Sequence, residues 1–125
     1  MIENLDFRNM KEEDTRLVNF VRTWLLESPP SIESGLARKV WKNSDLNGQI
    51  GQPAIVDALL NQQENGFFIE CGAYDGVSLS NSLFFEVKRG WTGLLIEPNM
   101  AAYVMLKRSG RKVYLVPIIV HCKFS

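Results

Sequence analysis

The chain has 125 residues, of which 46% are hydrophobic and 22% charged, a composition typical of one small globular domain with a modest core. Fourteen basic residues balance fourteen acidic ones, so no net charge would attract nucleic acid or an anionic membrane surface. No apolar run approaches the roughly 20 residues that cross a bilayer. We therefore expect a soluble chain with no membrane span and no nucleic-acid partner.

The first third of the chain predicts a helix followed by a linker. Apolar residues recur at helical spacing, which predicts an amphipathic helix over residues 12–27 that ends before two prolines; the apolar positions are Leu17, Val18, Val21, Trp24 and Leu25. Residues 31–51 have no clear period and are interpreted as a linker with at most a short helical turn. We assign residues 1–50 to an N-terminal helical and linker extension.

The remaining residues predict an alternation of helices and strands. A helix is expected over 53–63, with Pro53 in its first turn, where a missing N–H costs least. The expected elements that follow are a strand at 67–69, a helix at 77–89 capped by Ser78 or Ser80, a strand at 93–97, a helix at 100–109 ended by Gly110, and a strand at 113–116. Such an alternation predicts an α/β fold with about three parallel strands joined by right-handed crossovers.

A glycine turn follows the first of these strands. The apolar run at 67–69 is typical of a strand buried on both faces, and it ends in Glu70, with Gly72 and Gly76 just beyond. Glycine permits backbone conformations and close ligand approaches that a Cβ prevents, and ligands of parallel sheets bind at this end of the strands. Tyr74 occupies the place of the middle glycine of the dinucleotide fingerprint, which disfavours a pyrophosphate cofactor such as NAD or FAD.

A second acid completes the pattern. Glu97 ends the second strand and follows Gly76 at close to the roughly 20-residue spacing between a glycine turn and a ribose-binding acid. Two carboxylates suit a cofactor with a ribose and an ammonium group but no phosphates, namely S-adenosylmethionine. Glu97 would bind the ribose hydroxyls and Glu70 would lie near the ammonium. The adenine would rest on Ile96 or Pro98.

Simpler interpretations stay open for each of these residues. The glycine turn is also compatible with an ordinary connection from strand to helix, and Glu97 with a surface acid before a proline. Asp75 is equally compatible with a turn residue whose side chain binds its own backbone. In that case the domain is a small α/β scaffold.

Other reactive residue types give weaker signals. Cys71 lies where a small buried residue is expected, and no neighbouring base or cation would activate its thiol. His121 lacks visible partners for a metal site or for general-base catalysis, so we expect no metal. Four basic residues near the last helix are interpreted as a solvated helix end: Lys107, Arg108, Arg111 and Lys112.

The same residues carry a resemblance to a known family. Residues 66–117 resemble the FkbM-type methyltransferase domain, and more narrowly its animal Star-like branch. The matching segments are Phe68-Ile69-Glu70-Cys71-Gly72-Ala73-Tyr74-Asp75-Gly76, Leu79-Ser80-Asn81, Gly90-Trp91-Thr92-Gly93-Leu94-Leu95-Ile96-Glu97-Pro98-Asn99 and Arg111-Lys112, with Gly51-Gln52 and Asp57-Ala58-Leu59-Leu60 upstream. The resemblance covers somewhat under half of the chain.

The resemblance implies a Rossmann-like, S-adenosylmethionine-dependent methyltransferase fold of which only the N-terminal half is present. Residues 51–125 would be a truncated domain of this kind. The cofactor-binding residues implied by the resemblance, together with their immediate neighbours, are Glu70, Gly72, Ala73, Gly76, Glu97 and Pro98. Acceptor residues normally follow later strands, so we assign no catalytic residue.

Two functions follow from the resemblance. FkbM-type enzymes methylate hydroxyl groups of small molecules and sugars, whereas a Star-like protein is a noncatalytic factor in trafficking between endoplasmic reticulum, Golgi and endosomes, with protein partners in the secretory pathway. A complete sheet of this fold has about seven strands as the resemblance implies. We therefore expect the first strand to expose an unpaired edge, and we expect the 125-residue form to be inactive and to bind the cofactor weakly at best.

Overall fold

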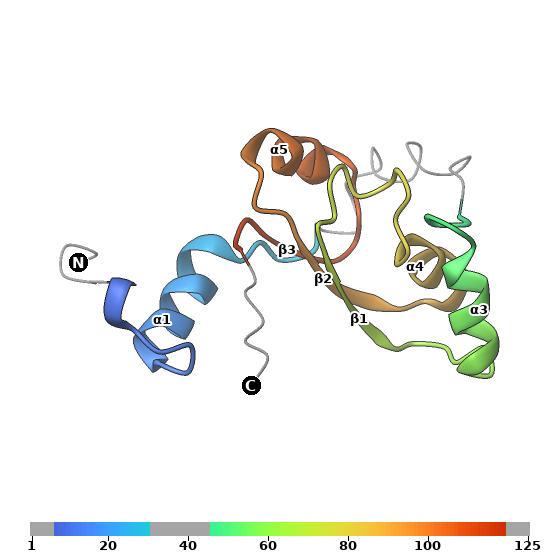
Figure 1. Cartoon of the computed structure of the whole chain (residues 1–125), viewed down its shortest axis with the longest axis horizontal. Helices are drawn as coiled ribbons and strands as arrows, with labels where there is room; N and C mark the ends of the chain where they lie inside the picture. Colours follow the sequence, from blue (N-terminus) through green and yellow to red (C-terminus); the bar gives the residue numbers. More distant parts are fainter. Residues whose placement is uncertain (1–6, 31–45, 120–125) are drawn as a thin grey trace.

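Three parallel strands form the centre of the molecule. The computed structural model describes residues 7–30 and 46–119, so His121 lies outside the described residues. The strands are β1 (Phe67–Cys71), β2 (Thr92–Ile96) and β3 (Tyr114–Val116), arranged in the order β1-β2-β3 (Figure 1). The crossovers contain α4 (Leu83–Arg89) and α5 (Met100–Arg108). The predicted α/β class and the parallel alternation are confirmed.

In the part of the chain that the structure describes, four elements precede the sheet. They are η1 (Phe7–Asn9), α1 (Thr15–Phe20), η2 (Val21–Leu25) and α3 (Gln52–Leu59). Figure 1 shows α1 beside β3 and α3 beside β1, so these helices lie at opposite sides of the sheet. None of the helices formed by residues 7–30 and 46–119 is long and apolar enough to cross a membrane.

The main core lies between the sheet and α5. Leu95 of β2 and Leu115 of β3 are register partners, and both are buried with Tyr103 and Leu106 of α5. Residues 103 and 106 are one helical turn apart, so both reach the same face of the sheet. The apolar sequence of this helix also predicts Val104 on the inward face, and this is wrong, because its place on the helix turns it outward and leaves it exposed.

The N-terminal extension contacts the outer edge of β3. Glu27 and Leu115 exchange two backbone hydrogen bonds, of 2.8 and 3.0 Å, in an isolated antiparallel bridge. The Glu27 carboxylate also pairs with Lys107 of α5 at 3.0 Å. The outer N–H and C=O of Leu115 are therefore paired by a segment nearly ninety residues earlier in the chain.

The first helix differs from the prediction for 12–27. It begins at Thr15, because the Asp14 side chain accepts the N–H of Arg16 and caps the helix. Its last turn is a π-helix closed by a hydrogen bond from Leu26 to Val21, five residues back. The wider turn changes the phase of the 3.6-residue pattern, so Trp24, predicted on the apolar stripe, is 62% exposed.

Helix α3 ends at Leu59 rather than at residue 63. Asn61 and Gln62 have φ angles of 51° and 58°, in the left-handed region that a right-handed helix cannot continue through. The Asp57 carboxylate in α3 accepts two hydrogen bonds from the Arg89 guanidinium, of 2.7 and 2.6 Å. This ion pair joins α3 to α4 and was not predicted from the sequence.

Strand β1 is the edge of the sheet. Phe67 is 55% exposed and Ile69 is 65% exposed, so the expected burial of this strand on both faces is wrong. Cys71, expected to be buried, is also exposed. The expected unpaired edge is confirmed, because no strand formed by the described residues lies on the outer side of β1.

Candidate functional site

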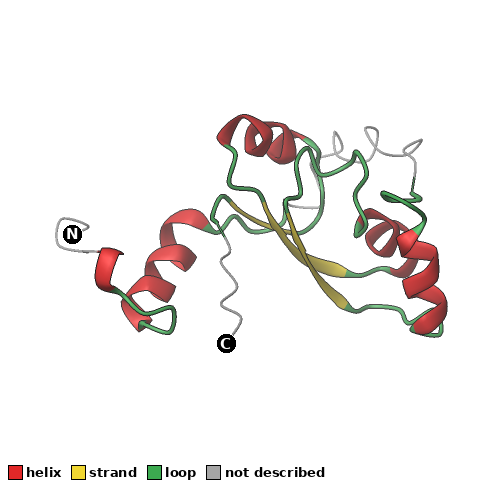
Figure 2. Cartoon of the chain, viewed as in Figure 1, coloured by secondary structure: helices red, strands yellow, loops and turns green. Residues whose placement is uncertain are grey.

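The loops after β1 and β2 lie at the same end of the sheet (Figure 2). The first is a bend that turns at Gly72, Tyr74 and Gly76, with φ angles of 71°, 54° and 80°. The N–H groups of Gly72 and Ala73 both donate to the carbonyl oxygen of Ile96, at 2.8 and 3.1 Å. The bend is therefore tied to the last residue of β2, immediately before Glu97.

Glu97 lies against this bend. Its Oε2 accepts the N–H of Tyr74 at 2.7 Å, and its Oε1 accepts the N–H of Asn99 at 2.9 Å. The residue is 7% exposed. The structure thus brings Glu97 and the glycine bend together, as the spacing predicts, and it places a buried carboxylate between the two loops. Each of its oxygens has a further lone pair for another donor.

Asp75 shapes the bend from within. Its carboxylate accepts the N–H groups of Val77 and Ser78, at 2.9 and 2.7 Å, and the Ser78 hydroxyl at 2.6 Å. Partial burial raises the pKa of Asp75, but these hydrogen bonds outweigh it, and the pKa lies below its ordinary value. The interpretation of Asp75 as a turn residue is confirmed.

Glu70 binds the next segment of the same loop. Its carboxylate accepts the hydroxyl of Ser80 at 2.8 Å, the N–H of Asn81 at 3.0 Å, and the hydroxyl of Ser82. These contacts hold residues 77–82 in turns, and Leu79 has a φ of 57°. The predicted helix over 77–89 is therefore wrong in its first six residues. The Ser80 hydroxyl accepts the N–H of Leu83, so it does support the start of α4.

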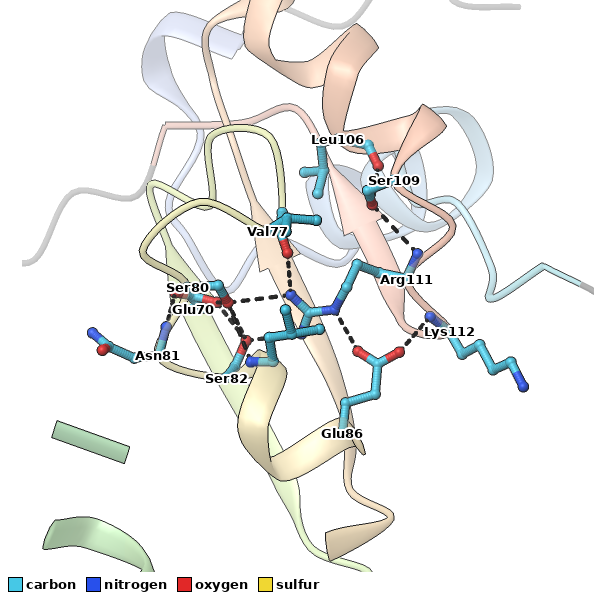
Figure 3. Close-up of polar contacts among 12 residues, drawn as sticks. Glu70, Val77, Ser80, Asn81, Ser82, Glu86, Leu106, Ser109, Arg111 and Lys112 are labelled. Atoms are coloured by element: carbon cyan, nitrogen blue, oxygen red, sulfur yellow. Dashed lines mark hydrogen bonds and ion pairs between the residues drawn. The ribbon is translucent and has the colours of Figure 1, made fainter. Parts of the chain in front are cut away.

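A buried arginine completes this network and was not predicted. The Arg111 guanidinium donates to the carbonyl oxygen of Gly76 at 2.6 Å, to Ser80 at 3.2 Å, to Ser82 at 3.0 Å and to Glu86 at 2.5 Å (Figure 3). Glu86 also accepts the N–H of Lys112 at 2.8 Å. One side chain thus connects the glycine bend, the serine turns and α4.

The predicted solvated basic cluster is corrected by this network. Arg111 is 1% exposed, because its guanidinium donates four hydrogen bonds to carboxylate, hydroxyl and carbonyl acceptors inside the protein. Lys107 and Arg108 remain on the surface at the end of α5. From the sequence, Arg111-Lys112 is singled out only by the resemblance, and the pattern gave no indication of the partners of Arg111.

A cavity of about 610 Å³ lies beside β1. It is lined by residues of the bend and of the serine turns, and by apolar side chains from α3 and its C-cap, β1, α4 and the residue before β2. These apolar residues are Val56, Leu60, Phe68, Ile69, Phe85 and Trp91. Its size is that of a small-molecule site. Among the predicted residues, Glu70, Gly72 and Ala73 line the cavity, whereas Gly76, Glu97 and Pro98 do not.

The two glycines of the bend have different surroundings. A Cβ on Gly72 would meet no atom within 4 Å, so the space beside its backbone is open. A Cβ on Gly76 would lie 2.6 Å from the Leu106 side chain, so Gly76 is required for packing against α5. Close approach of a ligand to the main chain is therefore available at Gly72.

Comparisons with known proteins add no family. No protein-family model, no curated protein and no solved structure matches the chain. In residues 7–30 and 46–119, no group of three or more His, Cys, Asp or Glu side chains is placed to hold a metal ion. The functional conclusion therefore depends on the geometry of the bend, Glu97 and the cavity.

Proposed function

We propose that this chain is an S-adenosylmethionine-binding, methyltransferase-like domain of the FkbM type, related to enzymes that methylate hydroxyl groups of small molecules or sugars. The observation that carries the proposal is the hydrogen bond of 2.7 Å between Glu97 and the N–H of Tyr74. It joins the acid after β2 to the bend after β1, the two parts from which adenosyl sites of parallel sheets are built.

The residues present fit such a cofactor at the bend. Gly72 borders the cavity and has open space where a Cβ would lie, so a ligand can rest on its main chain. Glu97 does not line the cavity, so we assign it the positioning of the bend through Tyr74, with its remaining lone pairs available to the ribose hydroxyls. Ala73 would contribute main chain. Tyr74 lines the cavity, and in the sequence it takes the place of the middle glycine that lets a pyrophosphate approach the backbone. When bound, the cofactor supplies an activated methyl group.

A second function is favoured by one specific observation. Both oxygens of Glu70 accept hydrogen bonds from the turn at residues 80–82, although this residue was expected beside the ammonium of the cofactor. A loop whose carboxylates are already satisfied by the protein is suited to a permanent scaffold. The alternative is therefore a noncatalytic, Star-like module with a protein partner in secretory trafficking.

Two glycine substitutions test the proposal. Gly72→Ala places a methyl group in the cavity, whereas Gly51→Ala is a matched control, because Gly51 has a similar φ of 77°, has equally open space and does not line the cavity. Each introduces about 1–2 kcal/mol of backbone strain. Calorimetric titration with S-adenosylmethionine, continued to millimolar concentration, should show weak binding to the unmodified chain and to Gly51→Ala, and at least a tenfold loss for Gly72→Ala. Equal affinity of the two variants would contradict the proposal, and absence of binding to the unmodified chain would favour the scaffold.

A further inference from the structure

Within residues 7–30 and 46–119, the outer edge of β1 has a defined set of unpaired main-chain groups. Thr92 donates to the carbonyl oxygen of Gly66, and Gly72 donates to that of Ile96. Because bonding residues alternate along a parallel strand, the even-numbered residues of β1 face β2. The N–H and C=O groups of Phe67, Ile69 and Cys71 therefore point away from the sheet.

This edge lacks the features that usually protect an exposed strand. Residues 67–71 contain no lysine or proline, and their register with β2 is continuous, without a bulge. The only charged residue, Glu70, is turned onto Ser80 and Ser82. Phe67 and Ile69 present apolar side chains to water. An edge of this kind is a template for another strand.

We propose that a second copy of this chain pairs its β1 with this edge in antiparallel orientation, about a two-fold axis at Ile69. In this register Ile69 faces the partner's Ile69, and Phe67 faces the partner's Cys71. These are hydrogen-bonded pairs of an antiparallel ladder, in which facing residues exchange both bonds. The outward N–H and C=O groups of all three residues are thereby satisfied.

The symmetry of the edge is the reason for choosing a second copy. The three outward-facing residues lie symmetrically around Ile69, and all three are uncharged, so the two-fold pairing brings no like charges together. A strand from another protein would need a complementary pattern, whereas this edge complements itself. The partner strand would border the cavity that Ile69 and Cys71 line, but the pairing itself requires no cofactor.

The surface available predicts a weak dimer. At about 150–200 Å² for a large apolar side chain, the exposed parts of Phe67, Ile69, Val56 and Leu60 give roughly 350 Å² per protomer, or about 700 Å² for the pair. The paired main chains add to this area, but the total stays near the lower limit for a specific interface. We therefore expect dissociation in the micromolar range.

A charge-swap experiment tests the register. Ile69→Lys and Ile69→Glu should each be monomeric in sedimentation at concentrations where the unmodified chain is dimeric, because identical charges meet at the axis. An equimolar mixture of the two should restore the dimer, since Lys then faces Glu. Met105→Lys, on the exposed face of α5, should dimerise like the unmodified chain. Circular dichroism checks that every variant is folded.

Disulfide cross-linking tests the distance between the two Ile69 positions across the proposed interface. Residues facing each other in a hydrogen-bonded pair have Cα atoms about 5.5 Å apart, within the range of a disulfide. In a chain with Cys71→Ser and Cys122→Ser, Ile69→Cys should form a covalent dimer under mild oxidation, at least tenfold more than Met105→Cys. Three results would overturn the proposal. The unmodified chain could stay monomeric, the equimolar mixture of Ile69→Lys and Ile69→Glu could fail to dimerise, or Ile69→Cys and Met105→Cys could cross-link equally.

Discussion

The carboxylate of Glu97 accepts the backbone N–H of Tyr74 at 2.7 Å, although the two residues are 23 positions apart. The same carboxylate accepts the N–H of Asn99, just before α5. Glu97 therefore has a structural role whether or not it binds a ligand. A substitution that removes it alters the bend as well as any ligand contact, which is why Gly72 is the better position for a binding test.

We expect Glu97→Gln to destabilise the fold. The substitution places an amide NH₂ against one of the two N–H groups that Glu97 now accepts, so one buried donor loses its partner. The free energy of unfolding should fall by about 1–3 kcal/mol, measured by urea denaturation. Glu64→Gln is the control, because Glu64 is exposed, and its change should be within about 0.5 kcal/mol. Equal stability of the two variants would show that the Glu97 contacts contribute little.

Arg111 should be among the most sensitive positions in the chain. Replacement by methionine keeps much of the volume but leaves Glu86 without its buried partner, and the Gly76 carbonyl and two serines lose a donor. We expect a loss of about 3–5 kcal/mol in the free energy of unfolding. Arg108→Met, on the exposed side of α5, should cost less than about 0.5 kcal/mol. Similar values for both variants would contradict the network in Figure 3.

The two bend glycines should respond differently to alanine. Gly72→Ala and Gly76→Ala share the strain of a positive φ, about 1–2 kcal/mol each. Only Gly76→Ala also brings a methyl group against Leu106, which adds about 1–3 kcal/mol from overpacking. Thermal unfolding should therefore give a clearly lower midpoint for Gly76→Ala. Equal midpoints would mean that α5 yields freely at this contact.

Stability should fall in acid. The Arg89 guanidinium lowers the pKa of Asp57, and hydrogen bonds lower that of Asp75 despite its partial burial. The stabilisation from a lowered pKa is complete above the unfolded-state pKa, about 3.9, and is lost as the pH falls through the folded-state value. Unfolding free energies should therefore be level above about pH 5 and decline below pH 4. In Asp57→Asn the free energy of unfolding should decline less steeply with falling pH than in the unmodified chain. An equal slope would exclude Asp57 as a cause of the acid sensitivity.

The sequence predicted the sheet and the position of Glu97 because both depend on local pattern. Strands and helices alternate with clear periods, and the carboxyl ends of parallel strands meet at one edge of a sheet. Glu97 therefore had to lie near the residues that follow Glu70. Asn99 and Gly110 bound α5 as their residue types suggest.

The remaining features depend on contacts between distant parts of the chain. Arg111 meets Gly76 and Ser82 across 35 and 29 positions, and nothing in its local sequence distinguishes it from the surface basic residues beside it. Residues 77–82 have a helical apolar pattern, but Glu70 captures their donors from the end of β1. Trp24 lies in a π-helical turn that periodicity cannot indicate.

The most direct test of the adenosyl site is an amide NMR titration of the unmodified chain with S-adenosylmethionine, continued to millimolar concentration. If the site is at the bend, the largest shifts should fall on the amides of residues 72–74 and of Asn99, because residues 72–74 line the cavity and the N–H groups of Tyr74 and Asn99 bind Glu97. Adenosine alone should shift the same amides. No shifts, or shifts confined to another part of the fold, would contradict the assignment of this site.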